Sequence, residues 1–471
     1  MAIQTKPAAS SAPNYTIPFI IVTALFGIFG FLTNLNSNLA PKLQDIFHLN
    51  YMWSNFVTTS WFLAYLVFSV PSGKLIEKIG YKSSMVTSLF IMVVGALLFV
   101  PAAAMVSFPF FLTASFVLAT GVCVLQVSAN PYVSILGPEH SAPARLTLAQ
   151  AFNSLGSALA PIVVGFFILT EDTKNASPAV IAHTVQGPYI AIAISLLVLG
   201  FAVMFMYLPA IVSSRTAVAG APASGRSIWS YKHTVLSMIG IFFYVGLEIA
   251  LAANAIKYFL AQGVDLIAVV SHFFSSLGWI GSIISHLLGT LTEHKVAGFL
   301  ASFYMFAIMI GRFAGTVAMK VIRANRLLAG LGFFGVALLL VAMNTTGMTA
   351  VWCLILCGLA NSIMYPTIFT LGIAELGPMT SKGSGVISIG NFGGAVIPPL
   401  FGWLADKIGM HYAIVHDSAG VQLAVANHQE YHNLIADRFG FQYAFVLTII
   451  CYLYIAYFGI SGYKPARAVK A

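Results

Sequence analysis

Long apolar segments alternate with short polar connections along nearly the whole chain. Windows of about 20 apolar residues, the length that a helix needs to cross a lipid bilayer, cover six ranges in the first half of the chain: 17–38, 56–73, 83–104, 108–133, 147–169 and 188–209. After a break, six more windows cover 233–260, 297–320, 327–345, 349–373, 382–405 and 441–462. We therefore predict an all-α membrane protein with twelve transmembrane helices in two six-helix bundles.

The composition agrees with a chain that lies in lipid. Hydrophobic residues make up 59% of the 471 residues and charged residues only 7%, whereas water-soluble domains carry about 25% charged residues. The chain also has no Gly-rich phosphate loop, Walker motif or nucleophile elbow. We therefore expect neither an enzyme nor a transporter driven by ATP bound to this chain.

The break between the sixth and seventh windows divides the chain. It contains the stretch VSSRTAVAGAPASGRS, whose small residues, Pro and Gly are typical of a flexible linker. We expect an N-terminal bundle at 1–209, a cytoplasmic linker at 210–232 and a C-terminal bundle at 233–471. Two outer insertions are expected in the second half, at 262–296 and 406–440. The first is apolar enough for a thirteenth span, but such a span would reverse the charge bias of the loops, so we predict interfacial or hairpin helices instead.

The cations predict the orientation of the chain in the membrane. Under the twelve-span arrangement most of them fall on one side: Lys74, Lys78, Lys82, Arg145, Arg215, Arg226, Lys232, Arg312, Lys320, Arg323, Arg326, Lys382, Lys464, Arg467 and Lys470. Lys and Arg of short loops stay on the cytoplasmic side of a membrane, so both termini are expected there. The net charge of +9 is then explained by topology, without nucleic-acid binding.

The two halves share short patterns in corresponding spans. Pro131, Leu136 and Gly137 match Pro366, Leu371 and Gly372 in spacing, and Asn153, Gly156 and Pro161 match Asn391, Gly394 and Pro399. Internal repeats of this kind are typical of transporters that are built from two related halves. The sequence therefore predicts pseudo-symmetric bundles.

The stretch GKLIEKIGYK, from Gly73 to Lys82, follows the second window. It resembles the signature loop of the major facilitator superfamily, with Glu77 where Asp is commoner, and a degenerate copy with Arg312 follows the eighth window. Gly73 would let neighbouring helices approach closely. The resemblance implies a conformational latch made by Gly73, Glu77, Lys78 and Arg312, whereas the charge rule alone would explain the cations but not the glycine spacing.

More specific patterns cover nearly the whole chain. These are NLN from Asn34, LQVSANPYV from Leu125, RLTLAQAFNS from Arg145 and YPTIF from Tyr365. Together they resemble the fucose–galactose–glucose:proton symporter family of that superfamily. The resemblance implies an alternating-access carrier that imports a monosaccharide across the cell inner membrane. Gln126 is more similar to the glucose/galactose branch than to the fucose branch.

The chain departs from the fucose branch at the coupling positions. In that branch an acid in span one and another in span four couple sugar to protons, but the matching residues here are Ser37 and Gln126, which cannot titrate near neutral pH. Glu248 is the remaining carboxylate within the apolar windows. Because a lone buried carboxylate is costly, it is expected to bind a proton or a cation. It is our coupling candidate, for either H⁺ or Na⁺; a structural acid that bonds a neighbouring span is the alternative.

A neutral hexose needs amides, hydroxyls and an aromatic wall rather than a cluster of charges. The chain offers such groups at helical spacing, and the predicted substrate-binding residues are Asn34, Asn36, Gln126, Asn130, Gln150, Asn153, Glu248, Asn361 and Tyr365. The alternative for each amide is a structural hydrogen bond between helices.

No cofactor or metal is expected. His428 and His432 have the spacing of a helical metal pair, but a solvated loop explains them more simply. The expected partners are a small neutral sugar and the lipid bilayer, with the protein functional as a monomer. A hexose uniporter of the same fold and an exporter of small amphipathic molecules remain alternatives.

Overall fold

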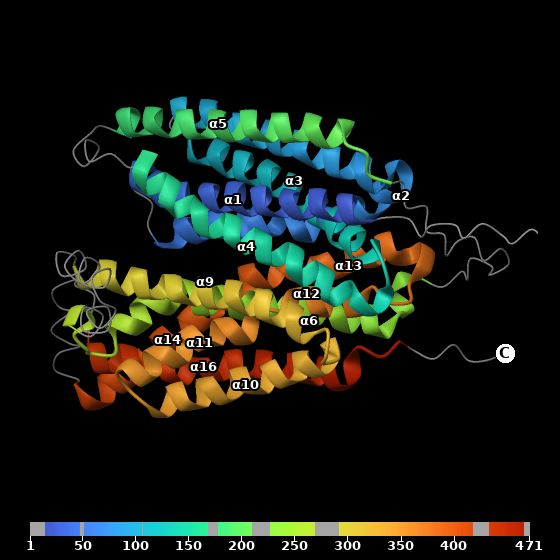
Figure 1. Cartoon of the computed structure of the whole chain (residues 1–471). Coiled ribbons are helices and arrows are strands. Elements are labelled where there is room, and N and C mark those ends of the chain that lie inside the picture. Colours follow the sequence, from blue (N-terminus) through green and yellow to red (C-terminus); the bar gives the residue numbers. More distant parts are fainter. Residues whose placement is uncertain are drawn as a thin grey trace, which may run out of the picture.

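The computed structural model describes residues 15–47, 51–105, 107–167, 178–209, 227–268, 292–417 and 433–465. The described part is helical throughout, because in lipid a helix satisfies its own backbone hydrogen bonds. The first bundle contains α1 (Thr16–Phe47), α2 (Tyr51–Ala104), α3 (Phe108–Ile135), α4 (Ala142–Phe167) and α5 (Pro178–Phe205). The second contains α6 (Lys232–Leu260), α9 (Glu293–Ala318), α10 (Ala324–Asn344), α11 (Met348–Asn361), α12 (Met364–Gly372), α13 (Thr380–Ser388), α14 (Gly393–His416) and α16 (Leu434–Tyr457). Figure 1 shows the two bundles one above the other.

Helix α2 makes two of the twelve passes. Its backbone leaves helical geometry at Gly80, where φ is 79° and ψ is 171°. Only glycine adopts this region readily, so the chain reverses there with a single non-helical residue. The predicted loop at 73–82 is therefore wrong in its extent, since both of its flanks are helical.

The predicted fold is confirmed. Nine helices of the described part are long and apolar enough to span a membrane, and one of these, Thr59–Ala104, is the reversed segment that contains Gly80. In the second bundle two passes are broken: α11 and α12 are separated at 362–363, and α13 and α14 are joined by the 3₁₀ turn Ile389–Phe392. With these pairs taken as single passes, each bundle has six.

The structure describes part of each predicted outer insertion. Helix α14 continues to His416 and α16 begins at Leu434, so both ends of the predicted insertion 406–440 are helical. A helix can run on past its apolar window, which here ends before Asp406 and Lys407. His428 and His432 lie outside the described residues. So do 269–291 of the first insertion and 210–226 of the linker.

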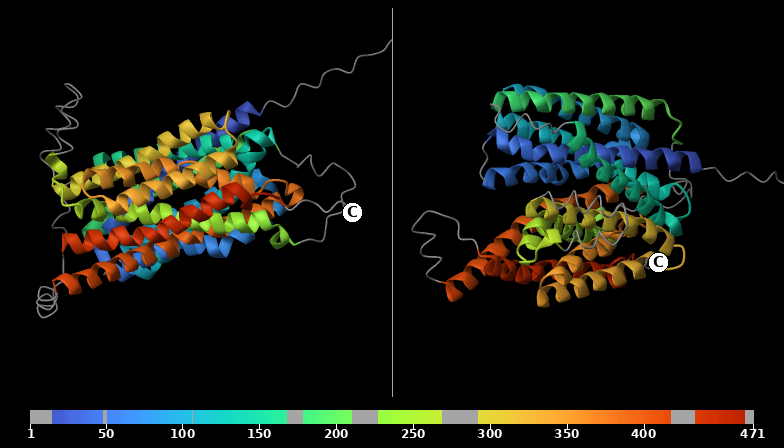
Figure 2. Two further views of the ribbon diagram at one scale, coloured as in Figure 1. Left: turned by 90° about the horizontal axis from the view of Figure 1, so that it is seen from below. Right: turned by 60° about the vertical axis from the view of Figure 1, so that its left-hand side comes forward.

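The molecule has two distinct ends. At the end called here the linker end, α5 finishes and α6 begins; at the far end, α6 finishes and α9 begins. The right-hand view of Figure 2 also shows the two bundles one above the other. The bundles meet chiefly where α4 lies against α9 and where α13 lies against α2 and α3. We call this interface between the two bundles the seam, and the candidate site lies in it.

Candidate functional site

Polar side chains from both bundles meet in the middle of the seam. Asn130, on α3, is fully buried and its amide nitrogen lies 3.4 Å from the hydroxyl of Tyr365 on α12. Asn391 approaches the same hydroxyl. Gln126 lies one turn from Asn130 on α3 and is half-buried. Two of the predicted binding residues, Asn130 and Tyr365, are thus brought into contact across the seam.

Aromatic rings form a wall beside these amides. The rings of Tyr244, on α6, and Tyr365 have centroids 6.1 Å apart, and Tyr365 stacks on Phe369 at 6.2 Å. Such rings give a sugar an apolar face to lie against, while their hydroxyls remain available for hydrogen bonds. The seam therefore combines the two kinds of surface that a hexose presents.

Several buried polar atoms in this region have no hydrogen-bond partner among the described residues. They include the side-chain oxygens of Gln126, Asn130 and Tyr244. A buried polar group without a hydrogen bond lowers the stability of the fold by about 1–3 kcal/mol. Such groups are rare in native proteins and often mark a functional site. A polar ligand or ordered water that enters the seam would satisfy them.

The charged centre of the seam consists of Glu248 and Arg312. Glu248 is half-buried near the middle of α6, and the Arg312 guanidinium on α9 lies within electrostatic range of its carboxylate. Arg312 is only 7% exposed. Its Nη1 donates to the backbone oxygen of Gln150 at 2.9 Å and to the hydroxyl of Ser154, and its Nε donates to the backbone oxygen of Ser362 at 3.2 Å.

Arg312 lies inside α9 rather than in a loop after it, and its hydrogen bonds join helices of both bundles. The degenerate copy of the signature loop is therefore helical at this position. The role of Arg312 in a latch stays a prediction.

The side-chain amides of two predicted binding residues, Asn361 and Asn153, form hydrogen bonds to neighbouring helices of their own bundle. Asn361 is fully buried; it donates to the hydroxyl of Tyr304 and accepts from that of Tyr452, each at 2.7 Å. Asn153 donates to the backbone oxygen of Phe26 in its own bundle at 3.1 Å. For these two amides the structure favours the alternative of hydrogen bonds between helices.

Three predicted binding residues remain: Gln150, Asn34 and Asn36. Gln150 is buried, and its backbone oxygen accepts from Arg312. Asn34 is half-buried on α1. The side chain of Asn36 lies outside the described part of the structure, so its predicted role stays a prediction.

Two residues of the site were not identified from the sequence. Tyr244 lies four residues before Glu248 and thus on the same helix face. Asn391 corresponds to Asn153 in the internal repeat, so the pseudo-symmetry could have identified it. Arg312 was predicted only as a latch residue, although a cation inside an apolar window is itself a signal of function.

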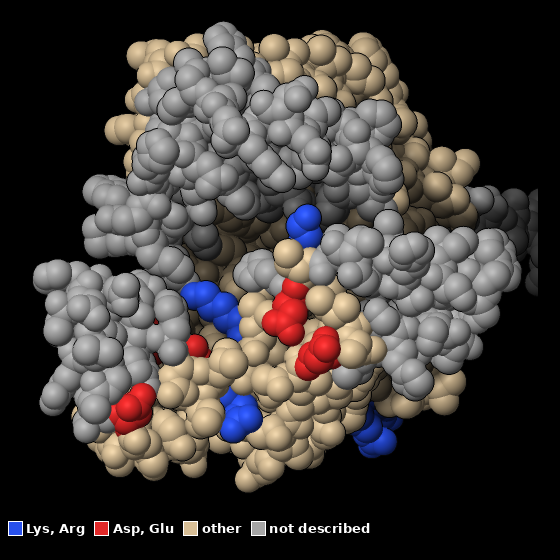
Figure 3. Space-filling view, turned by 90° about the vertical axis from the view of Figure 1, so that its left-hand side faces the viewer, with Lys and Arg blue, Asp and Glu red and all other residues tan. Residues whose placement is uncertain are grey.

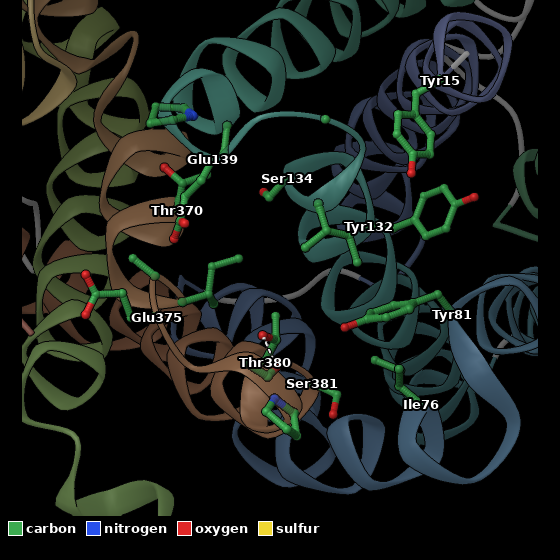
Figure 4. Close-up of a pocket in the computed structure, with 18 of the residues that line it drawn as sticks. Tyr15, Ile76, Tyr81, Tyr132, Ser134, Glu139, Thr370, Glu375, Thr380 and Ser381 are labelled. Carbon is green, nitrogen blue, oxygen red and sulfur yellow. Dashed lines mark hydrogen bonds between the residues drawn. The ribbon is translucent and has the colours of Figure 1, made fainter. Parts of the chain in front are cut away.

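A separate cavity of about 1170 Å³ opens at the linker end. Figure 4 shows Tyr15, Tyr81 and Tyr132 on one side of it and Thr370 and Glu375 on the other, so both bundles contribute to its wall. None of the predicted substrate-binding residues lines this cavity. It is a vestibule beyond the seam, on the way to the linker end.

The rim of this vestibule carries an ion pair between the two bundles. Lys382, on α13, lies 3.3 Å from Glu77 on α2, and both side chains are partly exposed. Just above it, α2 and α13 touch so closely that a Cβ at Gly73 would lie 2.7 Å from the backbone oxygen of Ser381. Of the predicted latch residues, Gly73 and Glu77 thus face the other bundle, whereas Lys78 is exposed.

Arg145 stabilises the turn that leads from α3 into α4 at the same end. It donates to the backbone oxygens of Val133 and Pro138, at 3.3 and 2.8 Å. Partial burial lowers the pKa of its guanidinium to about 10, so it stays charged at neutral pH.

The far end has a different shape. Figure 3 looks onto this end and shows the surface hollowed between the two bundles, with charged side chains of both signs on the C-terminal bundle. Toward the linker end the bundles contact each other, α13 against α2 at Gly73 and Ser381 and α4 against α9 at Gln150 and Arg312.

Two helix bundles of six passes each, with a polar site in the seam between them, define a membrane-embedded transporter. The chain belongs to the major facilitator superfamily, whose family model matches residues 20–397. The family and the fold predicted from the sequence are thereby confirmed.

Known proteins resemble the chain along most of its length. The glucose/galactose transporter of Brucella abortus biovar 1 (strain 9-941) is 36% identical over 458 residues, which are 97% of this chain and 96% of that protein. The L-fucose-proton symporter of Escherichia coli (strain K12) is 30% identical over 85% of this chain and 90% of its own. A crystal structure of the transporter FucP in the outward conformation is 26% identical, with a TM-score of 0.72 over 95% of this chain and 99% of that one.

Proposed function

We propose that this protein is a secondary active transporter that imports a neutral hexose of the glucose/galactose type, in symport with H⁺ or Na⁺. The observation that carries the proposal is that the side-chain oxygens of Asn130 and Tyr244, two residues that contact Tyr365, have no hydrogen-bond partner among the described residues. Each hydroxyl of a hexose can donate and accept, so one sugar could satisfy both. Gln126, one turn from Asn130 on α3, has a further unpartnered side-chain oxygen. The printed names of the relatives, glucose/galactose transporter and L-fucose-proton symporter, support the same substrate class.

Glu248 is the proposed coupling residue. It lies on the helix that carries Tyr244, near the sugar site, and its charge changes when it takes up a proton or binds a cation. Because Ser37 and Gln126 replace acids at the coupling positions that the fucose branch uses, the gradient must act elsewhere. The name of the Escherichia coli relative makes H⁺ the first ion to test.

The proposed setting is the cell inner membrane, with the linker end in the cytoplasm and the protein acting as a monomer. Cations on described residues of the linker end support this orientation: Lys74, Lys78, Lys82, Arg145, Lys320, Arg323, Arg326 and Lys382. In the proposed cycle, bundles 1–209 and 233–471 rock about the seam, joined by the linker 210–232. Gly73 and Glu77, with Lys78 beside them, would form the inner latch.

Hexose counterflow in proteoliposomes tests this function. Liposomes loaded with unlabelled glucose or galactose should take up the labelled sugar saturably and without any ion gradient. In Asn130→Ala the half-saturating concentration should rise about tenfold, since one or two hydrogen bonds to the sugar are lost. Asn344→Ala is the matched control, because this exposed amide bonds only within its own helix.

The absence of counterflow for every hexose in the wild-type protein would overturn the proposal. If Asn130→Ala binds the sugar with wild-type affinity, Asn130 is not part of the sugar site. Thermal unfolding of the three proteins, measured in parallel, separates lost binding from lost folding.

A further inference from the structure

Arg312 occupies a position that the transport proposal does not explain. Its side chain lies where α4 of one bundle meets α9 and the α11–α12 break of the other, and three of its contacts are to neutral oxygens, on Gln150, Ser154 and Ser362. Next to it the rings of Phe152 and Phe313 meet edge to face at 5.9 Å. Arg312 thus ties the two bundles together.

This tie closes the linker end of the seam. Gln150 lies in the first half of α4, which starts at the linker end, and Arg312 lies near the end of α9, which finishes there. If the bundles part at the linker end, these two helix segments must separate. The hydrogen bonds of Arg312 to α4 must then break.

A guanidinium remains charged under all ordinary conditions. Buried with neutral acceptors alone it would be an uncompensated charge, which strongly disfavours the state that buries it. The titratable groups that interact with Glu248 are Tyr244 on its own helix and Tyr304 and Arg312 on α9. Tyr365 on α12, Tyr452 on α16 and Cys357 on α11 lie next to Tyr244 or Tyr304. Arg312 is the one cation among them, and Glu248 is the one anion.

Glu248 is also fixed relative to α9 through its backbone. The hydroxyl of Tyr304 donates to the backbone oxygen of Glu248 at 3.3 Å, and Tyr304 lies two turns before Arg312 on α9. The carboxylate of Glu248 is therefore held beside the helix that carries the guanidinium of Arg312. A change of charge on Glu248 changes the electrostatic energy of Arg312.

We propose that Arg312 is the positioning residue through which Glu248 controls the linker-end closure. Ionised Glu248 balances the buried guanidinium, which keeps its bonds to α4 and holds the linker end shut. When the carboxylate takes up a proton, Arg312 is left as an uncompensated buried cation. The tied state then loses stability relative to the state in which the bundles part.

Protonation that favours opening at the linker end is the direction that an importer needs. A proton and a sugar taken up at the far end would favour opening at the linker end; after both leave, the ionised pair forms again and returns the carrier to its starting state. This inference rests on the proposed function, since it gives Glu248 a mechanism of coupling.

Spin-label distances across the linker end test the inference in the full-length protein. Labels at Ser83→Cys, on α2, and Val321→Cys, after α9, report the separation of the bundles; both positions are exposed. Lowering the pH should shift the wild-type distribution toward the longer distance. Glu248→Gln should show that shift already at neutral pH, with the ratio of long to short distances raised about tenfold or more, and should lose the pH dependence.

Two further variants separate this mechanism from a loss of packing. In Arg312→Gln no buried cation remains for Glu248 to balance, so the distance distribution should no longer change with pH. Glu375→Gln, which neutralises an exposed acid at the linker end, should behave as the wild type. Unchanged distances in Glu248→Gln, or a pH dependence that persists in Arg312→Gln, would overturn the proposal.

The wild-type pH titration decides the matter even if Glu248→Gln does not fold, because a pH-independent distribution also contradicts the mechanism. Failure of this inference is distinguishable from failure of the proposed function. A wild-type protein that exchanges hexoses while its linker-end distances ignore Glu248 and pH would remain a transporter without this switch.

Discussion

At the scale of single residues, the hydroxyl of Tyr244 offers a sharp test of the site. It is fully buried and lies beside Glu248 and Arg312, yet it makes no hydrogen bond of ordinary geometry with a described residue. Tyr244→Phe should therefore leave the unfolding temperature nearly unchanged. If the hydroxyl bonds the sugar, the sugar affinity should fall about 2- to 10-fold, the usual worth of one hydrogen bond.

Isothermal titration and thermal unfolding in detergent measure these two quantities. Unaltered affinity combined with a lower unfolding temperature would show that the hydroxyl is structural.

Asn361 should behave in the opposite way. Its amide joins α11 to Tyr304 on α9 and to Tyr452 on α16, and interhelical hydrogen bonds in membranes are worth about 0.6 kcal/mol on average and up to about 1.7. Asn361→Ala should therefore destabilise the fold by roughly 1–3 kcal/mol. The sugar affinity of the folded fraction should change little. A large loss of sugar affinity with unchanged stability would instead show that Asn361 belongs to the binding site.

The sequence could identify the kind of site but not which amides belong to it. Asn130 and Asn361 look alike in the sequence, since each is an amide four residues from a polar partner in an apolar helix. Only packing distinguishes them: Asn361 meets two tyrosines of its own bundle, whereas Asn130 meets Tyr365 across the seam and keeps one oxygen unpartnered. Contacts between segments more than 200 residues apart cannot be inferred from helical spacing.

At the scale of elements, the reversal at Gly80 is the most specific feature of the backbone. Gly80→Ala would force a side chain into a conformation with φ of 79°, at a cost of about 1–3 kcal/mol. Gly330 is a matched control, because it lies within helix α10 with nothing near a new Cβ. Gly330→Ala should stabilise the protein slightly, by about 0.5–1 kcal/mol.

Thermal unfolding of both variants in one detergent gives the comparison. Equal unfolding temperatures for Gly80→Ala and Gly330→Ala would contradict the single-residue reversal.

Most helices could be predicted to within a few residues, because bilayer thickness fixes the length of each apolar window. Helix α6 is an example: the window 233–260 matches Lys232–Leu260. Apolarity says nothing about the path of the backbone itself. The apolar windows therefore predict neither the helical residues within 73–82, nor the helical residues 406–416 beyond the eleventh window, nor the break at 362–363.

At the scale of the whole molecule, the pair of Glu77 and Lys382 should bias the carrier toward closure at the linker end. Both side chains are partly exposed, so solvent screens the pair and its worth is only about 0.2–1 kcal/mol. Glu77→Gln or Lys382→Gln should therefore raise the ratio of open to closed linker ends at most about fivefold. The exchanged variant, Glu77→Lys with Lys382→Glu, should restore it.

The spin-label distances described above measure these ratios, and high salt should reduce the difference between wild type and single variants. A single variant with the wild-type distribution at low salt would show that the pair plays no part in the closure.

The coupling of sugar import to an ion gradient through Glu248 is tested most directly by accumulation of labelled glucose or galactose in proteoliposomes. A proton or Na⁺ gradient is imposed on wild type and on Glu248→Gln. One of the two gradients should drive the wild-type protein to concentrate the sugar. Glu248→Gln should exchange sugar without concentrating it. Equal gradient-driven accumulation by both proteins would contradict the role of Glu248, and wild-type uptake that ignores both gradients would make the protein a uniporter.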